Sequence, residues 1–315
     1  MRAFVILLGL SIAAPLIFWG QQVNIEPRTK AQPRTKAQPK EEFPVPDIRV
    51  DSTLVLIPVA VSDPLGRPVT GLERDDFKLF DEKVQQTITS ISMEDEPIAM
   101  GLVFDASSSM GGVLRESSRA AGEFIKRSER GDQFFLVDFA STARLVVPLT
   151  TDPGPIRSEL AFAKAKGSTA LLDGVYMGLN EIRKSKLARK AIIVVSDGDD
   201  NHSRYTAGEV RNAVKETDVL MYTVGVFDSG YNPYGPGLLK SIAEGTGGRM
   251  FAAANVPLAE IAEKIGIDLR THYVLGYAPK DRKRDGKYHK VEVRISAPKE
   301  LGKLTARHRA GYYDE

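Results

Sequence analysis

The chain has 315 residues, with 43 Lys and Arg against 41 Asp and Glu, so its formal net charge is only +2. This near balance gives no argument for nucleic acid or for other acidic partners. The length is enough for one large or two small domains with a packed core. The absence of cysteine excludes disulfides, thiolate metal sites, a cysteine nucleophile and acylation of the lipoprotein type.

The N-terminal segment predicts export from the cytoplasm. In residues 1–20, Arg2 precedes an uncharged apolar run, which is typical of a signal peptide or of a short membrane anchor. The small-residue cleavage rule is poorly met after Gly20, so both alternatives stay open. Residues 21–46 repeat PRTKAQ and are rich in Pro, Lys and Arg, which predicts an extended linker. We therefore expect a secreted, periplasmic or membrane-anchored protein.

Residues 47–96 predict a short β region. Strands are expected at 50–61, 77–80 and 86–92, and the last should contain a bulge because Ile88 and Ile91 break strict alternation. No helix of ordinary length fits here. Three strands alone leave a sheet face and two edges without a partner.

Residues 271–315 predict the strands that complete this β region. The segment THYVLGYAP at 271–279 is expected to pair with a strand at 287–295 across an Asp-Gly turn, and 304–312 is expected to form another strand. Joining both sets of strands in one β-sandwich covers the apolar faces of each. The chain between them would then form a domain inserted into the sandwich.

Residues 97–270 alternate between apolar runs and segments of helical periodicity. The apolar runs predict six strands, at 98–104, 134–139, 144–149, 191–195, 219–227 and 249–252. The helical segments are 113–130, 155–164, 171–183, 206–217, 238–244 and 258–269. The second and third strands are too close for a crossover helix and should form an antiparallel hairpin. The pattern predicts a doubly wound, mostly parallel α/β sheet of the Rossmann-like kind.

Three loops rich in side-chain oxygen follow strands or precede helices of this sheet: 105–109 (DASSS), 167–169 (GST) and 196–201 (SDGDDN). Ligands of open α/β sheets bind beyond the carboxyl ends of the strands. Oxygen ligands without sulfur or nitrogen suit a hard cation, Mg²⁺ or alternatively Mn²⁺ or Ca²⁺. Helix capping is the simpler interpretation of any single loop. Asp199, Asp200 and Asn201 extend the third loop and could hold water or a second cation, although plain solvation is the simpler expectation.

The three loops resemble the metal-ion-dependent adhesion site of the von Willebrand factor type A domain. Five positions match that motif in order: Asp105, Ser107, Ser109, Thr169 and Asp197. The resemblance implies that the two serines bind the cation directly and that the threonine joins them when a ligand is bound. It implies that the two aspartates act directly or through water. The layout of the chain, with HYVLGYAP and RAGYYD after the inserted domain, is similar to bacterial secreted proteins related to this domain.

The site residues admit more than one function. We expect a non-enzymatic adhesion or binding module that captures, through its cation, a carboxylate of a protein partner. A metal-dependent hydrolase or phosphotransferase is the alternative, but no His or Lys stands at motif spacing from Ser107 and Ser109, and Asp105 lacks the second acid of an Asp-x-Asp pair. A structural scaffold stabilised by its cation is a further alternative. We expect no catalytic residues and no nucleic-acid partner, and the oligomeric state stays open.

Overall fold

The computed structural model describes most of the chain after residue 53. The described residues are 54–93, 96–126, 128–227, 234–253, 256–280, 286–296 and 302–314. The signal peptide or anchor expected at 1–20 and the linker expected at 21–46 lie outside these ranges. Within the described ranges, no helix is both long enough and apolar enough to cross a membrane.

A six-stranded mixed sheet forms the centre of the α/β region. Its order is β10-β9-β8-β5-β6-β7, and every neighbouring pair is parallel except β6 and β7. The strands are β5 (Ile98–Asp105), β6 (Gln133–Phe139), β7 (Ala143–Thr150), β8 (Arg189–Ser196), β9 (Leu220–Gly225) and β10 (Met250–Ala252). The predicted doubly wound sheet and its single antiparallel hairpin are confirmed.

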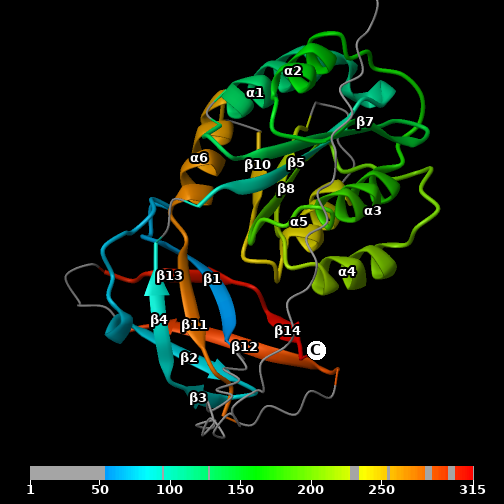
Figure 1. Ribbon diagram of the computed structural model, residues 1–315. Helices are drawn as coiled ribbons and strands as arrows, with labels where there is room; N and C mark the ends of the chain where they lie inside the picture. Colours follow the sequence, from blue (N-terminus) through cyan, green and yellow to red (C-terminus); the bar gives the residue numbers. More distant parts are fainter. Residues whose placement is uncertain are drawn as a thin grey trace, which may run out of the picture. The chain divides into compact units, whose positions relative to one another are not determined.

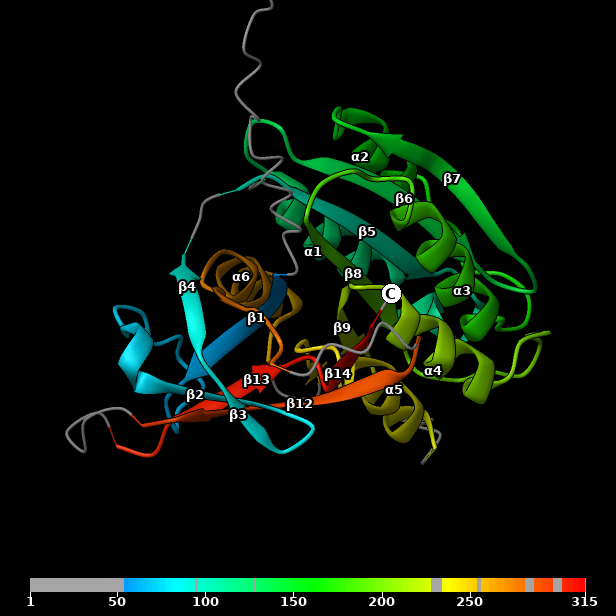
Figure 2. The same ribbon diagram turned by 60° about the horizontal axis from the view of Figure 1, so that its bottom comes forward.

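Helices cover both faces of this sheet (Figures 1 and 2). One face is covered by α1 (Leu114–Lys126), α2 (Gly154–Ala161) and α6 (Leu258–Arg270). The other face is covered by α3 (Leu171–Ile182), α4 (Ala207–Glu216) and α5 (Gly235–Ala243). Local sequence sets several of these boundaries. At the start of α4, for example, Thr206 and Glu209 form a reciprocal capping box, which satisfies backbone groups that the first turn leaves unpaired.

Strand β5 shows why the apolar runs become buried strands. All of its residues are buried, as expected where helices cover both faces of a parallel strand. Successive side chains point to opposite faces, so Met100 packs in the core under α1 while Val103 packs in the core under α3. Gly101 leaves room for the ring of Phe135 on β6, because a Cβ at this position would lie 2.0 Å from a ring carbon.

Two four-stranded antiparallel sheets form a β-sandwich from the two ends of the described chain (Figure 1). The first has the order β13-β1-β11-β4 and the second has the order β14-β12-β2-β3. The N-terminal strands are β1 (Val55–Ser62), β2 (Phe77–Asp81), β3 (Val84–Gln86) and β4 (Ile88–Ser92), with a short 3-10 helix η1 (Arg74–Asp76). The C-terminal strands are β11 (Tyr273–Tyr277), β12 (Tyr288–Ile295), β13 (Thr305–His308) and β14 (Gly311–Tyr313). Both sheets mix the two sets, so the α/β region is inserted in the sandwich, as predicted.

The pairing expected between 271–279 and 287–295 is wrong. Strand β11 pairs with β1 and β4, whereas β12 pairs with β2 and β14 in the opposite sheet. Both hydrogen-bonding edges of β11 are taken by N-terminal strands, so the chain crosses to the second sheet before β12 begins. Of the residues expected to turn, 280–286, residues 281–285 lie outside the described ranges.

Two segments that each predict one strand contain two. The strand expected at 86–92 includes the last residue of β3 and all of β4, and the strand expected at 304–312 includes β13 and part of β14, with each pair split between the two sheets. The chain changes sheets there with only one or two intervening residues, so hydrophobic alternation shows no gap. The predicted bulge in β4 is confirmed by a register shift: Tyr277 faces Ile88, whereas Gly276 faces Ser90.

Candidate metal centre

The three oxygen-rich loops meet at the carboxyl edge of the central sheet. The first loop follows β5 and includes the 3-10 helix η2 (Ser108–Gly112), the second precedes α3, and the third follows β8. The backbone N–H of Ser108 donates to Gly167 O at 3.1 Å and joins the first loop to the second. Thr169 O accepts from the N–H of Asn201 at 3.0 Å and joins the second loop to the third. All five predicted site residues are carried by these three adjacent loops.

Asp105 lies at the centre of this arrangement and is completely buried. Its Oδ1 accepts from the Ser107 N–H at 2.8 Å, and its Oδ2 accepts from the Ser196 hydroxyl at 2.6 Å. Burial raises the pKa of Asp105 to about 6, against the opposing effect of these hydrogen bonds, and the charge of Asp197 raises it further. A buried carboxylate held by neutral donors is costly to ionise, and a cation placed beside it would relieve that cost.

The serine hydroxyls of the first loop face each other. The Oγ atoms of Ser107 and Ser109 are 3.0 Å apart, with Ser107 fully buried and Ser109 exposed. Ser107 occupies the N-cap position of η2 with an extended backbone, yet its side chain makes no capping hydrogen bond. Helix capping therefore does not account for the Ser107 hydroxyl. The oxygens of both serine hydroxyls have lone pairs that can coordinate a cation.

Thr169 is held through its backbone N–H and Asp197 through its side-chain carboxylate. The Thr169 N–H donates to Asn201 Oδ1 at 3.0 Å, and its side chain is almost fully buried. Asp197 is half-buried, and its Oδ1 accepts from the Asp199 N–H at 3.0 Å. Gly198 has a left-handed backbone with φ of 83°, and a Cβ there would lie 2.5 Å from Gly235 O at the start of α5. The position after Asp197 therefore requires glycine.

The donor set has few charges. Among the described residues, no group of three His, Cys, Asp or Glu side chains is placed to hold a metal ion. The candidate centre instead combines two carboxylates with neutral hydroxyls, which is a set of oxygen ligands that Mg²⁺ accepts. The residues present fit a hard divalent cation in chemistry and in their neighbouring positions.

Two residues of the expected third loop, 196–201, support the site in ways that the sequence does not reveal. Ser196 ends β8, and its hydroxyl donates to Asp105 and accepts from the Gly198 N–H at 3.0 Å. Asn201 is exposed, as expected of a solvated residue, but its side chain also holds the Thr169 backbone. Both contacts join segments distant in the chain, so only the folded arrangement reveals them.

The third loop is also fastened to α3. Asp173 is buried, and its Oδ1 accepts from the backbone N–H groups of Arg204 and Tyr205 at 2.8 and 3.1 Å. The Arg204 side chain pairs with the other carboxylate oxygen at 3.0 Å. Asp173 thus anchors the end of the loop and does not face the candidate metal centre as a further ligand.

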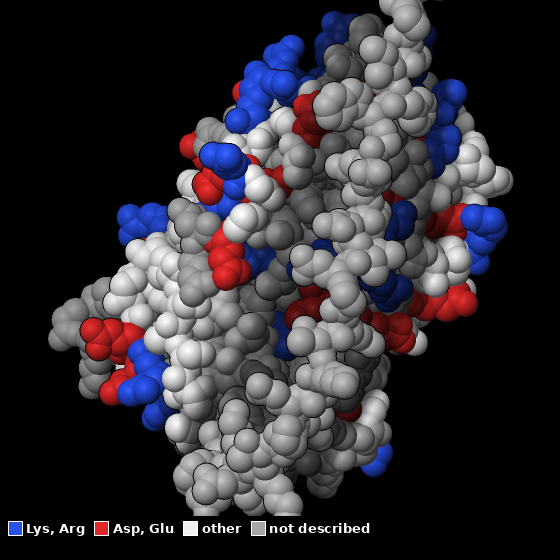
Figure 3. Space-filling view, viewed as in Figure 1, with Lys and Arg blue, Asp and Glu red and all other residues white. Residues whose placement is uncertain are grey.

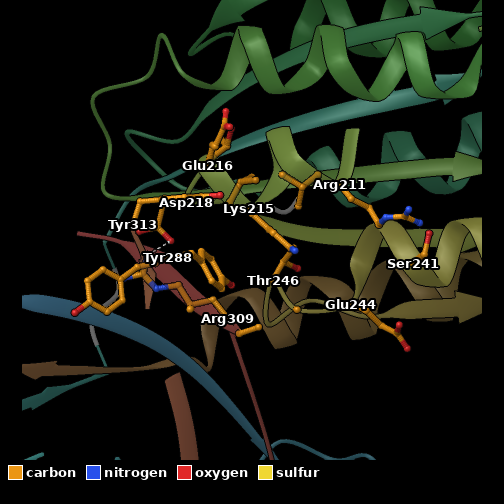
Figure 4. A pocket seen from close by; sticks show the side chains of 17 residues that line it. Arg211, Lys215, Glu216, Asp218, Ser241, Glu244, Thr246, Tyr288, Arg309 and Tyr313 are labelled. Atoms are coloured by element: carbon orange, nitrogen blue, oxygen red, sulfur yellow. Dashed lines mark ion pairs between the residues drawn. The ribbon is translucent and has the colours of Figure 1, made fainter. Parts of the chain in front are cut away.

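A hollow in the surface lies away from these loops, between α4, α5 and the strands β12 and β14 (Figure 4). Its three carboxylates all have cationic partners. Asp218 pairs with Arg309 at 2.8 Å, the pair that Figure 4 marks with a dashed line, while Glu216 pairs with Arg183 and Glu244 with Lys240. The amino group of Lys215 lies 5.7 Å from the ring centre of Tyr288. The Asp218–Arg309 pair joins the α/β region to the sandwich, so the hollow lies at a structural junction between them.

Comparison with known proteins identifies the α/β region. Residues 100–199 match the sequence family described as the von Willebrand factor type A domain. An uncharacterized protein of Borreliella burgdorferi is 31% identical over 138 residues, which cover 41% of this chain and 40% of that protein. An uncharacterized protein of Synechocystis sp. is 30% identical over 110 residues, 34% of this chain and 26% of that protein. The chain thus spans less than half the length of these curated relatives.

The same fold occurs in a solved structure of proximal thread matrix protein 1 from the mussel byssus, described with zinc in its adhesion-site motif. The two chains superimpose with a TM-score of 0.50 and 21% identity, over 61% of this chain and 50% of the mussel protein. At this identity the likeness concerns the fold alone. Residues 100–199 thus match the von Willebrand factor type A domain, and the α/β region has the fold of that domain, built into a β-sandwich formed by the strands on either side of it.

Proposed function

We propose that the three loops form a metal-ion-dependent adhesion site and that the chain is a non-enzymatic, extracytoplasmic binding module for a protein partner. The proposed ligands are Ser107 and Ser109 directly, Thr169 when a partner is bound, and Asp105 and Asp197 directly or through water. Mg²⁺ is the proposed cation, with Mn²⁺ and Ca²⁺ as alternatives. The domain division at residues 97 and 270, with sandwich halves at 47–96 and 271–315, is part of this proposal.

The buried carboxylate of Asp105 carries the proposal. It receives only neutral hydrogen bonds, and the paired serine hydroxyls lie on the same loop. A divalent cation supplies, when bound, a coordination position that a carboxylate of the partner can take. Hydroxyl ligands neutralise less of the ionic charge than carboxylates do, which favours an anionic group in that position. Ser196 and Asn201 act by orienting Asp105 and Thr169.

Two observations favour binding over hydrolysis. The Ser107 hydroxyl is hydrogen-bonded to the Ser109 hydroxyl and to Asp105, and Asp105 is proposed to hold the cation rather than to serve as a general base. His308 and His289 lie on strands of the sandwich, where His308 Nε2 accepts from the Val293 N–H and His289 approaches Asp81. The zinc in the mussel protein's motif supports the idea that such loops in this fold accept a divalent cation.

Cation binding is tested on the full chain by calorimetric titration with Mg²⁺ and by thermal unfolding with and without it. At a concentration of one hundred times Kd, binding stabilises the folded state by about 2.7 kcal/mol, which raises Tm by about 5 °C for a domain of this size. Ser107→Ala and Asp197→Ala should abolish the titration signal and the shift. Ser158→Ala and Asp75→Ala change exposed residues of the same types elsewhere and should preserve both. An unchanged titration in Ser107→Ala and Asp197→Ala variants that fold would refute the metal centre.

Partner capture requires a second experiment. We expect the immobilised chain to retain a defined protein from an envelope extract in Mg²⁺, to release it on chelation, and to retain none through the Ser107→Ala variant. Replacing the acidic residues of the retained protein should abolish capture. Turnover of phosphate or ester substrates that persists through exhaustive purification and disappears in Ser107→Ala would overturn the non-enzymatic assignment. Protection from added protease after the outer envelope has been opened, with the inner membrane intact, would contradict an extracytoplasmic location.

A further inference from the structure

A basic groove lies between α1 and α2 and reaches the candidate metal loop. Its volume is about 650 Å³. One wall is formed by α1 and the other by α2 and the segment that follows it, while Gly111 of η2 contributes at the boundary with the first metal loop. The basic side chains that line it are Arg115, Arg119, Lys126, Arg157 and Lys164. Figure 3 shows Lys and Arg side chains gathered over α1 and α2.

Most of these charges have no internal partner. Lys126 pairs with Glu123, the acidic side chain in the groove lining, at 2.6 Å. Among the described residues, no carboxylate forms an ion pair with Arg115, Arg119 or Arg157, and all three are exposed. The hollow in Figure 4 differs because its lining has three basic and three acidic side chains, so its formal charges balance. The groove therefore has an excess of positive charge that is available to a ligand.

We infer that this groove binds an acidic peptide segment of the protein partner, adjacent to the residue that the metal centre captures. The inference rests on the proposed function, because it assigns the partner's flanking sequence to the groove. The basic stripe on α1 runs from Arg115 to Lys126, which is a rise of about 16 Å along the helix. An extended peptide of about five residues spans that length. The partner is therefore one with several Asp or Glu residues close to the captured carboxylate.

The shape of the groove favours a peptide over other polyanions. A space of about 650 Å³ between two helices admits a single extended chain but not a nucleic-acid duplex, whose major groove alone is about 12 Å wide. A membrane surface would instead meet a flat or convex basic patch. The groove includes Gly111, so a peptide bound in it would lie next to the loop of the proposed metal centre.

Fluorescence anisotropy of labelled peptides tests the inference on the full chain. The probes are hexaglutamate and hexaglutamine, each in Mg²⁺ and in chelator at low salt. We expect hexaglutamate to bind and hexaglutamine not to bind. In the Arg115→Gln/Arg119→Gln variant the affinity for hexaglutamate should fall about tenfold, in line with the loss of two weakly screened charge contacts. The matched control, Lys186→Gln/Arg211→Gln, removes two exposed charges associated with the other helix layer and should bind as the wild type does.

The metal variant separates this inference from the proposed function. If chelation and Ser107→Ala leave hexaglutamate binding unchanged while the arginine variant weakens it, the groove is supported and the metal-dependent capture of this probe is refuted. Equal binding by the wild type and the Arg115→Gln/Arg119→Gln variant overturns the groove. Equal binding of the two peptides also overturns it. Tighter arginine-dependent binding of single-stranded DNA or of anionic lipid vesicles overturns the assignment of an acidic peptide.

Discussion

His272 provides the sharpest test of the energetics of this fold. It joins α6 to β11 and is only 4% exposed. Burial lowers the pKa of His272 to about 4, against the opposing effect of Asp268, while the charges of Arg307 and Arg189 lower it further. The folded protein therefore holds this imidazole neutral in a pH range where the unfolded chain protonates it.

The sign and size of the effect follow from linkage. In the unfolded chain the pKa of His272 is about 6.5, so below that pH the unfolded state binds a proton that the folded state does not. The free energy of unfolding therefore falls as the pH drops from 6.5 towards 4. With these two pKa values, the loss between pH 7.5 and pH 5 is about 2 kcal/mol, and the full loss below pH 4 is about 3 kcal/mol.

The assay is urea unfolding followed by far-ultraviolet circular dichroism at pH 7.5 and pH 5. We expect His272→Leu to remove about 2 kcal/mol of the difference between the two pH values, because leucine cannot take up a proton. His202→Leu, which replaces an exposed histidine, should leave the difference unchanged. Comparing each variant with the wild type cancels other titrating groups, such as Asp105, whose raised pKa acts in the opposite direction. If His272→Leu retains the full pH dependence, burial of this imidazole is not its cause.

Two further substitutions test particular contacts. Gly198→Ala should lower the free energy of unfolding by about 2 kcal/mol and weaken Mg²⁺ binding, because φ is 83° and the new Cβ would lie 2.5 Å from Gly235 O; unaltered urea unfolding would contradict the close packing. Arg307→Met should cost about 3 kcal/mol, because Asp268 would stay buried with only the Tyr222 hydroxyl at 2.8 Å and the more distant Arg249 guanidinium at 4.0 Å. If the Arg307→Lys variant has the same free energy of unfolding as the wild type, the positive charge alone, without the guanidinium geometry, is sufficient to stabilise buried Asp268.

Sequence periodicity was enough to predict the α/β region because each of its elements buries a continuous or regularly spaced apolar surface. The apolar run that becomes β8 lies in the middle of the sheet. A strand that is apolar on both faces is buried only where helices cover both faces of the sheet, so this run indicates a central strand of an α/β sheet. The sandwich was harder to predict. Strands β3 and β4 are separated by one residue yet belong to different sheets, and alternation cannot show to which sheet a strand belongs.

The composition of the candidate site was also readable from the chain. Asp105, Ser107 and Ser109 are close in sequence, and the carboxyl-edge rule for α/β sheets predicts that the loops of Thr169 and Asp197 lie near them. The hydrogen bond from Ser196 to Asp105 spans 91 residues, so no local pattern could reveal it. The supporting contacts were therefore decided by the register of β5 against β8.

The sequence by itself determined the alternation of strands and helices, the oxygen-rich loops and the positions that resemble an adhesion site, because these depend on local spacing and side-chain chemistry. Only the tertiary structure decided where charge accumulates. The whole chain has a formal net charge of only +2, yet folding places α1 beside α2 and separates their basic side chains from most of the acidic ones. Net charge is a sum over residues, whereas a partner meets the local field of one surface, and that field depends on which distant segments pack together.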